Sequence, residues 1–95
     1  MEVNESLRRI FYPSSVVVIG VSERPENLAR LIIDNLHNFG YKGKVFAAGR
    51  TKRIVQGIPI ASSLDDIPGG LDLAVILTPA VTVPDLMESC ARKGI

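Results

Sequence analysis

The chain contains no tryptophan, one histidine and one cysteine among its 95 residues. A single thiol excludes an internal disulfide and a cysteine-built metal cluster within one chain. No apolar run approaches the roughly 18 residues that a membrane span needs, and the first nine residues, MEVNESLRR, lack the apolar core of a signal peptide. The sequence therefore predicts a cytoplasmic protein with no metal site and no membrane partner.

Acidic residues are missing from a long internal stretch. Eleven basic and ten acidic side chains leave a net charge of +1, which gives no argument for nucleic acid as a partner. Between Asn35 and Leu64, however, there is no Asp or Glu. All the charges of that stretch are basic: Lys42, Lys44, Arg50, Lys52 and Arg53. A solvated loop is the ordinary explanation of such a run, and the fold decides which of these cations face a ligand.

Alternating strand and helix patterns follow one another along the chain. Residues 15–20, SVVVIG, form a β-branched run that is typical of a parallel strand covered on both faces. Apolar residues then recur at helical spacing (Leu28, Leu31, Ile32, Leu36 and Phe39) up to Gly40, a C-cap glycine. Two more strands are predicted at residues 44–48 (KVFAA) and 71–77 (LDLAVIL), with a short extended piece at residues 57–61 between them.

Several helix-start and helix-stop signals complete the pattern. Leu7, Ile10 and Phe11 share one face of a short leading helix before Pro13. Ser63 is placed to cap a single helical turn. Thr82 and Asp85 form a capping pair for a last helix.

This order predicts an α/β protein with a three-layer, Rossmann-like fold and a parallel sheet. We expect residues 1–95 to form a single domain. A doubly wound sheet would continue with another strand after the helix that precedes Ile95. The fold is therefore expected to be truncated after its last helix, as part of a longer multidomain protein, or to form a homodimer through the exposed sheet edge.

Ligands of such folds bind beyond the carboxyl ends of the strands. Three segments meet there: GVSERPENLA (20–29), AGRTKR (48–53) and LTPAVTVPD (77–85). Gly20 can supply a tight turn and Ser22 an N-cap, but the GxGxxG fingerprint of dinucleotide-binding proteins is absent. The second strand ends in Gly49 and Arg50, where NAD requires an acid. Arg50 and Lys52 favour a ligand with phosphate on its ribose, either NADP or coenzyme A.

The chain resembles the coenzyme A-binding domain of the succinyl-CoA synthetase α subunit and, more closely, of NDP-forming acyl-CoA synthetases. The resemblance is carried by FYPSSVVVIGVSERP, NFGYKGKVFA and VQGIPIASSLDDIPGGLDLAVILTPAVTVPDLMESCARKGI. It implies that backbone amides of the first loop cradle the phosphates of coenzyme A, that the second loop meets the adenosine end, and that a Pro-Ala turn completes the site. The implied residues are Gly20, Val21, Ser22, Glu23 and Arg24, then Arg50 and Lys52, then Thr78, Pro79 and Ala80.

In that family the domain binds and orients coenzyme A without performing chemistry itself, beside ATP-grasp and phosphohistidine domains of the parent acid-CoA ligase. The chain departs from the family pattern at Glu26, Asn27 and Ala29, where glycines are usual, and at residues 49–51, where Asn-Pro-Lys is usual. Two alternatives stay open: an NADP-type nucleotide-binding domain, and a ligand-free interaction or regulatory domain that has lost its phosphate loop.

The remaining chemistry-bearing residues have structural explanations. His37 lies near the end of a helix and is predicted to be structural or to face solvent. Asp65, Asp66 and Asp72 lie at a capped turn and at a strand start, where Asp forms local hydrogen bonds. Cys90 lies on an apolar helical stripe, which favours an inert core thiol. No base accompanies Ser22 as a nucleophile, so no catalytic residue is predicted.

Overall fold

The structure, a computed structural model, describes residues 2–22, 26–50 and 54–95, with residues 2–6 described by their backbone alone. Among these residues one sheet is formed by β1 (Ser15–Ile19), β2 (Lys44–Ala48), β3 (Ile54–Val55), β4 (Ile58–Ala61) and β5 (Leu73–Ile76). Their spatial order is β3-β4-β2-β1-β5. All neighbours pair in parallel except β3, which is antiparallel to β4. The predicted parallel Rossmann-like sheet is confirmed, with β3 as an unpredicted addition.

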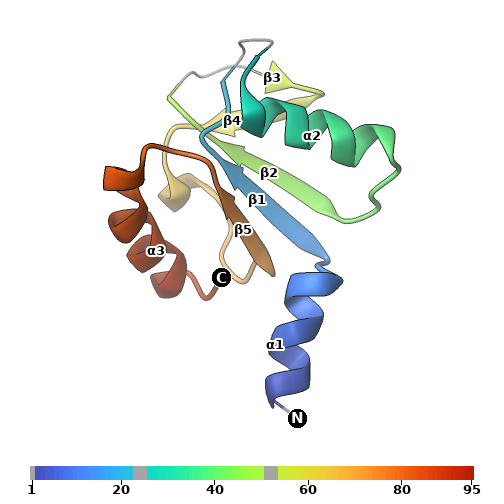
Figure 1. Cartoon of the computed structure of the whole chain (residues 1–95), viewed down its shortest axis with the longest axis vertical. Coiled ribbons are helices and arrows are strands. Elements are labelled where there is room, and N and C mark those ends of the chain that lie inside the picture. Colours follow the sequence, from blue (N-terminus) through green and yellow to red (C-terminus); the bar gives the residue numbers. More distant parts are fainter. Residues whose placement is uncertain (1, 23–25, 51–53) are drawn as a thin grey trace.

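The helices lie on both faces of the sheet, as Figure 1 shows. Helix α2 (Leu28–Asn38) covers one face, and α3 (Val83–Arg92) covers the other together with the 3-10 turn η1 (Leu64–Asp66). A second 3-10 turn, η2 (Ala80–Thr82), leads into α3. The chain leaves β1 toward one face and β5 toward the other, so the strand order reverses between these two neighbours. Such a switch point is where ligands bind in open α/β sheets.

The two faces of β1 explain why its sequence reads as one continuous apolar run. Val16 and Val18 pack into the core under α2, whereas Val17 and Ile19 pack into the core under α3. Each of the four is at most 4% exposed. A strand buried on both faces has no position for a polar side chain.

Helix α2 forms where its apolar spacing predicts, but its buried face differs from the most apolar positions. Ala29 and Ile33 are each 1% exposed, whereas Leu28 is 60% and Phe39 is 86% exposed. Ala29 and Ile33 are four residues apart and therefore lie one turn above the other on the side facing the sheet. Small Ala29 allows α2 to approach β1 closely.

The second face carries the predicted turn and the predicted core thiol. Ser63 Oγ accepts a hydrogen bond from the Asp65 amide at 3.2 Å, as expected for the cap of η1. Cys90 is buried among Leu64, Ile67 and Leu71. Burial raises the pKa of its thiol, which keeps it protonated and unreactive at neutral pH.

Helix α1 (Glu2–Phe11) projects from the amino end of β1 (Figure 1). It is anchored beside the strand ends by an Arg9–Asp72 ion pair of 3.8 Å and, just after it, by the Tyr41 hydroxyl, which donates to the Pro13 carbonyl at 2.7 Å. Burial, together with the Asp72 charge, raises the pKa of this phenol. No helix of the described ranges is both long and apolar enough to cross a membrane.

Candidate functional site

Three loops and the start of α2 meet where the parallel strands end, and we call residues 20–22, 26–29, 49–50 and 77–80 the carboxyl edge. Backbone hydrogen bonds continue the sheet beyond its strands at this point. The amides of Gly20 and Val21 both donate to the Ala48 carbonyl, at 2.8 and 3.0 Å, and the Leu77 amide donates to the Ile19 carbonyl at 2.9 Å. The segments that the sequence placed together are therefore adjacent in the fold.

Two glycines allow this convergence. A Cβ atom on Gly20 would overlap the Leu77 carbonyl oxygen and lie 3.2 Å from Thr78 Cγ2, and its φ of +102° is one that side chains rarely tolerate. A Cβ atom on Gly49 would overlap the Val21 carbonyl oxygen. The loops after β1, β2 and β5 thus touch through bare backbone, and Gly20 forms the tight turn predicted for it.

Asn27 links the end of β1 to α2 and takes the N-cap position that was predicted for Ser22. The N-cap of α2 is Asn27, whose Oδ1 accepts from the Arg30 amide at 2.8 Å and from the Ser22 amide at 3.2 Å. Its Nδ2 donates to the Gly20 carbonyl at 3.1 Å. The expected Ser22 cap is wrong because the helix begins at Leu28, too far along the chain. The signal for Asn27 was present: an Asn directly precedes the first apolar residue of the helix.

Most described backbone donors of the first loop are already paired. The amides of Gly20 and Val21 bind Ala48, that of Ser22 binds Asn27, and the Val21 side chain is 1% exposed. Helix geometry leaves the amides of Leu28 and Ala29 in the first turn of α2 without an intrahelical acceptor. Together with the positive end of the helix dipole, these two amides favour an anion at this position.

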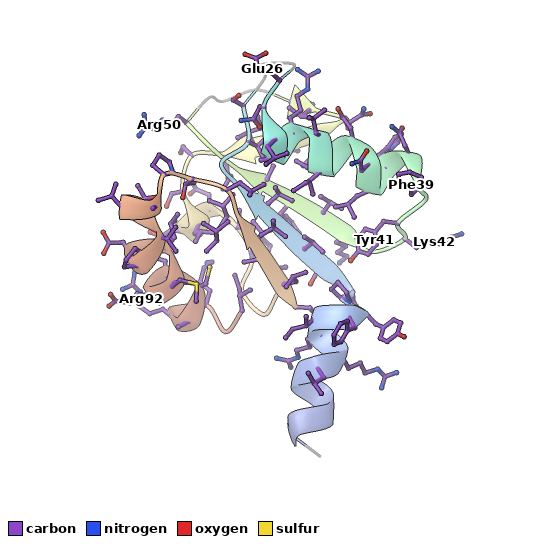
Figure 2. The ribbon with its side chains drawn as sticks, in the orientation of Figure 1. Glu26, Phe39, Tyr41, Lys42, Arg50 and Arg92 are labelled. Carbon is purple, nitrogen blue, oxygen red and sulfur yellow. The ribbon has the colours of Figure 1, made fainter. Side chains whose placement is uncertain are left out.

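The charged residues described at this edge are of both signs. Arg50 follows β2 and Glu26 precedes α2, both side chains are exposed, and Figure 2 labels them. Three further predicted site residues, Glu23, Arg24 and Lys52, lie outside the described residues.

The third loop carries the predicted Pro-Ala turn. Pro79 and Ala80 are exposed and Thr78 is half-buried beside Gly20. The Thr82 hydroxyl lies 2.7 Å from both Thr78 Oγ1 and the Pro79 carbonyl oxygen. These hydrogen bonds tie the end of η2 to the residues just before it. The predicted Thr82–Asp85 capping pair is wrong, because that hydroxyl makes no hydrogen bond to the first turn of α3.

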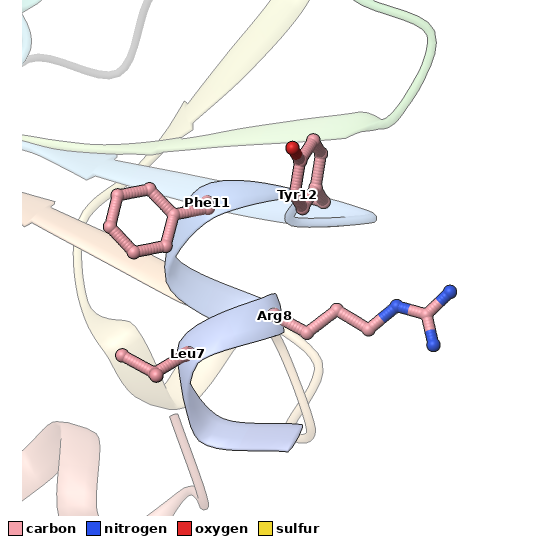
Figure 3. Close-up of a pocket in the computed structure, with 4 residues that line it drawn as sticks. All are labelled: Leu7, Arg8, Phe11 and Tyr12. Carbon is pink, nitrogen blue, oxygen red and sulfur yellow. The ribbon is translucent and has the colours of Figure 1, made fainter. Parts of the chain in front are cut away.

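Two open hollows lie at the amino ends of the strands, opposite the carboxyl edge. One is lined by Leu7, Arg8, Phe11 and Tyr12 on α1 and just after it (Figure 3). The second hollow is lined by Leu36, Tyr41 and Leu73, with Lys42 and Lys44 also in its lining. Both linings are mainly apolar and neither contains a cluster of titratable groups suited to chemistry.

The remaining titratable residues have structural surroundings, but Asp72 bonds to residues far from it in the sequence and not to the local partners that were predicted. His37 is exposed near the end of α2. Asp72 Oδ2 accepts from the Ser14 amide at 2.7 Å, and the Asp72 amide donates to Ser15 Oγ at 3.1 Å. Within the described ranges no three His, Cys, Asp or Glu side chains are grouped to hold a metal ion.

Comparison with known proteins finds relatives in both sequence and fold. The family model described as the CoA binding domain matches residues 14–95. The α subunit of acetate–CoA ligase (ADP-forming) I from Pyrococcus furiosus is 36% identical over 94 residues, covering 95% of this chain and 20% of that protein. Acetate–CoA ligase (ADP-forming) I from Archaeoglobus fulgidus is 39% identical over 89 residues, covering 94% of this chain and 13% of that protein.

A solved structure shares both fold and sequence. The crystal structure of PH0766 from Pyrococcus horikoshii OT3 superimposes with a TM-score of 0.81 and 36% identity, covering 94% of this chain and 20% of that one. The chain thus spans about a fifth or less of the length of these relatives.

Proposed function

Because the chain belongs to the CoA binding domain family, we propose that it binds coenzyme A at the carboxyl edge of its sheet. The observation that carries the proposal is the family match over residues 14–95, which includes all three loops of that edge. The switch point between β1 and β5 supports the same location. The family match favours coenzyme A over the NADP alternative.

Each part of the edge suits a different part of the ligand. The first turn of α2 suits the pyrophosphate. The Leu28 and Ala29 amides there can donate hydrogen bonds to its oxygens, so no charged side chain is needed to bind this anion. Exposed Arg50, with Lys52 near it in sequence, suits the 3′-phosphate of the adenosine end. The exposed Pro79–Ala80 turn offers an apolar contact across the switch point. Gly20, Val21 and Ser22 shape the loop.

The domain binds and orients the ligand, and its parent protein performs the chemistry. Relatives named ADP-forming acetate–CoA ligases carry a similar segment as a fifth or less of their length, which supports residues 1–95 as one domain of a larger ligase. ATP-grasp and phosphohistidine domains are the partners that such a ligase requires. The role of this domain is to hold the coenzyme A thiol toward the acyl group.

Isothermal titration of the purified chain with coenzyme A tests the proposal. Coenzyme A is expected to bind saturably and more tightly than NADP at the same salt concentration. A folded sample that gives no binding heat with either ligand would support the ligand-free alternative, and a preference for NADP would support a dinucleotide-binding domain.

The Arg50→Ala substitution separates the two ends of the ligand. If the guanidinium pairs with the 3′-phosphate, its loss lowers the affinity for coenzyme A about tenfold, which is the usual contribution of an exposed charge-assisted hydrogen bond. Dephospho-coenzyme A, which lacks that phosphate, is expected to bind the variant and the unsubstituted chain alike. The double variant with Lys52→Ala extends the test. An equal loss of affinity for coenzyme A and dephospho-coenzyme A would show that this loop does not bind the 3′-phosphate.

A further inference from the structure

Asn27 joins three backbone groups that belong to two different elements. Its Oδ1 receives the Arg30 amide from the first turn of α2 and the Ser22 amide from the loop. Its Nδ2 reaches back to the Gly20 carbonyl at the end of β1. One partly buried side chain therefore links the end of β1, Ser22 and the first turn of α2.

Gly20 is the other fixed point of this loop. Its backbone is held on one side by the Ala48 carbonyl and lies too close to the Leu77 carbonyl for any side chain. The Asn27 side-chain amide connects the Gly20 backbone to the helix by a hydrogen bond. Because Gly20 and Ser22 are already held against α2, less conformational entropy is lost at these residues when a ligand binds, which increases affinity.

A simple helix cap would need only part of these contacts. The hydrogen bond from the Arg30 amide to Oδ1 is the ordinary N-cap interaction, and serine supplies it nearly as well as asparagine. The hydrogen bond from Nδ2 to the Gly20 carbonyl lies outside the helix and requires an amide nitrogen at that reach. The second contact distinguishes a loop-positioning residue from a cap.

We infer that Asn27 is a positioning residue, which holds Gly20 and Ser22 against the first turn of α2 so that the amides of that turn can receive the pyrophosphate of coenzyme A. The inference rests on the proposed function and deepens it. Both coenzyme A and dephospho-coenzyme A contain the pyrophosphate, so both depend on Asn27.

The test compares Asn27→Ser with Asp72→Ala. Serine keeps the cap of α2 but is too short to reach the Gly20 carbonyl as well. Asp72→Ala also removes a side-chain acceptor from a backbone amide, that of Ser14, at the opposite end of the sheet. Because Asp72→Ala also removes the ion pair with Arg9, it is the more destabilising change, but only Asn27→Ser loses a hydrogen bond at the carboxyl edge.

For Asn27→Ser we expect a melting temperature close to that of the unsubstituted chain and dissociation constants about threefold to tenfold higher for both ligands. For Asp72→Ala we expect a lower melting temperature and unchanged dissociation constants well below it. Unchanged affinity of Asn27→Ser, with the unsubstituted chain binding coenzyme A, would overturn the inference and leave the function standing. If the folded unsubstituted chain does not bind, the proposed function fails and the inference with it.

Discussion

Replacing Gly20 with alanine is expected to destabilise the protein by about 2–5 kcal/mol. The φ of +102° costs a side chain roughly 1–2 kcal/mol, and the overlap of the new Cβ with the Leu77 carbonyl adds about 1–3 kcal/mol of overpacking. A domain of this size has a total stability of about 5–15 kcal/mol. Thermal unfolding should therefore show a melting temperature lower by about 10 °C or more.

Gly40→Ala is the matched control for this substitution. Gly40 also has a positive φ, +76°, but a Cβ atom there would have no neighbour within 4 Å. Alanine at Gly40 thus incurs the backbone strain without the overlap, at a cost of about 1–2 kcal/mol. Equal destabilisation by the two substitutions would show that the close approach of the β1 and β5 loops is not tight in solution.

Truncating Ile33 to alanine is the second large expected effect. Its side chain is 1% exposed and packs between α2 and the sheet. Removing it leaves a cavity in a close-packed core, which costs about 2–5 kcal/mol. Chemical denaturation should show a lower midpoint with little change in slope.

Leu31 on the same helix provides the comparison. It is 42% exposed, and its truncation to alanine should cost less than about 1 kcal/mol. A larger loss at Leu31 than at Ile33 would mean that α2 packs with a different face toward the sheet.

The comparison of these two residues also shows how far the sequence determined the fold. Apolar spacing located α2 within a residue of its ends, because the period of a helix is a local property. It did not identify Ile33 and Ala29 as the buried pair, because Leu28, Leu31 and Phe39 are equally apolar. Which side faces the sheet depends on how the chain leaves β1, and that is decided by tertiary contacts. The short strand β3 was missed because two residues give no periodicity.

The location of the site could be predicted from the sequence, but most of its hydrogen bonds could not. Strand ends and loop glycines located the carboxyl edge, because parallel topology brings those loops together. The Gly20 and Val21 amides donate to the Ala48 carbonyl, and pairing between segments so far apart in the sequence leaves no local signature. The Ser22 amide donates to Asn27, whose position directly before the helix was a local signal. Thr82 was misassigned for a different reason: its hydroxyl bonds to Thr78 and Pro79, just before a 3-10 turn that the sequence did not predict.

The measurement that tests the central claim most directly is a nuclear magnetic resonance titration of the ¹⁵N-labelled chain with coenzyme A. Binding at the carboxyl edge should shift the amide signals of Ser22, Leu28 and Arg50, and leave those of Gly43 and Asp72 at the opposite end of the sheet in place. Shifts confined to residues 42–44 and 72, or to the hollow beside α1, would contradict the account.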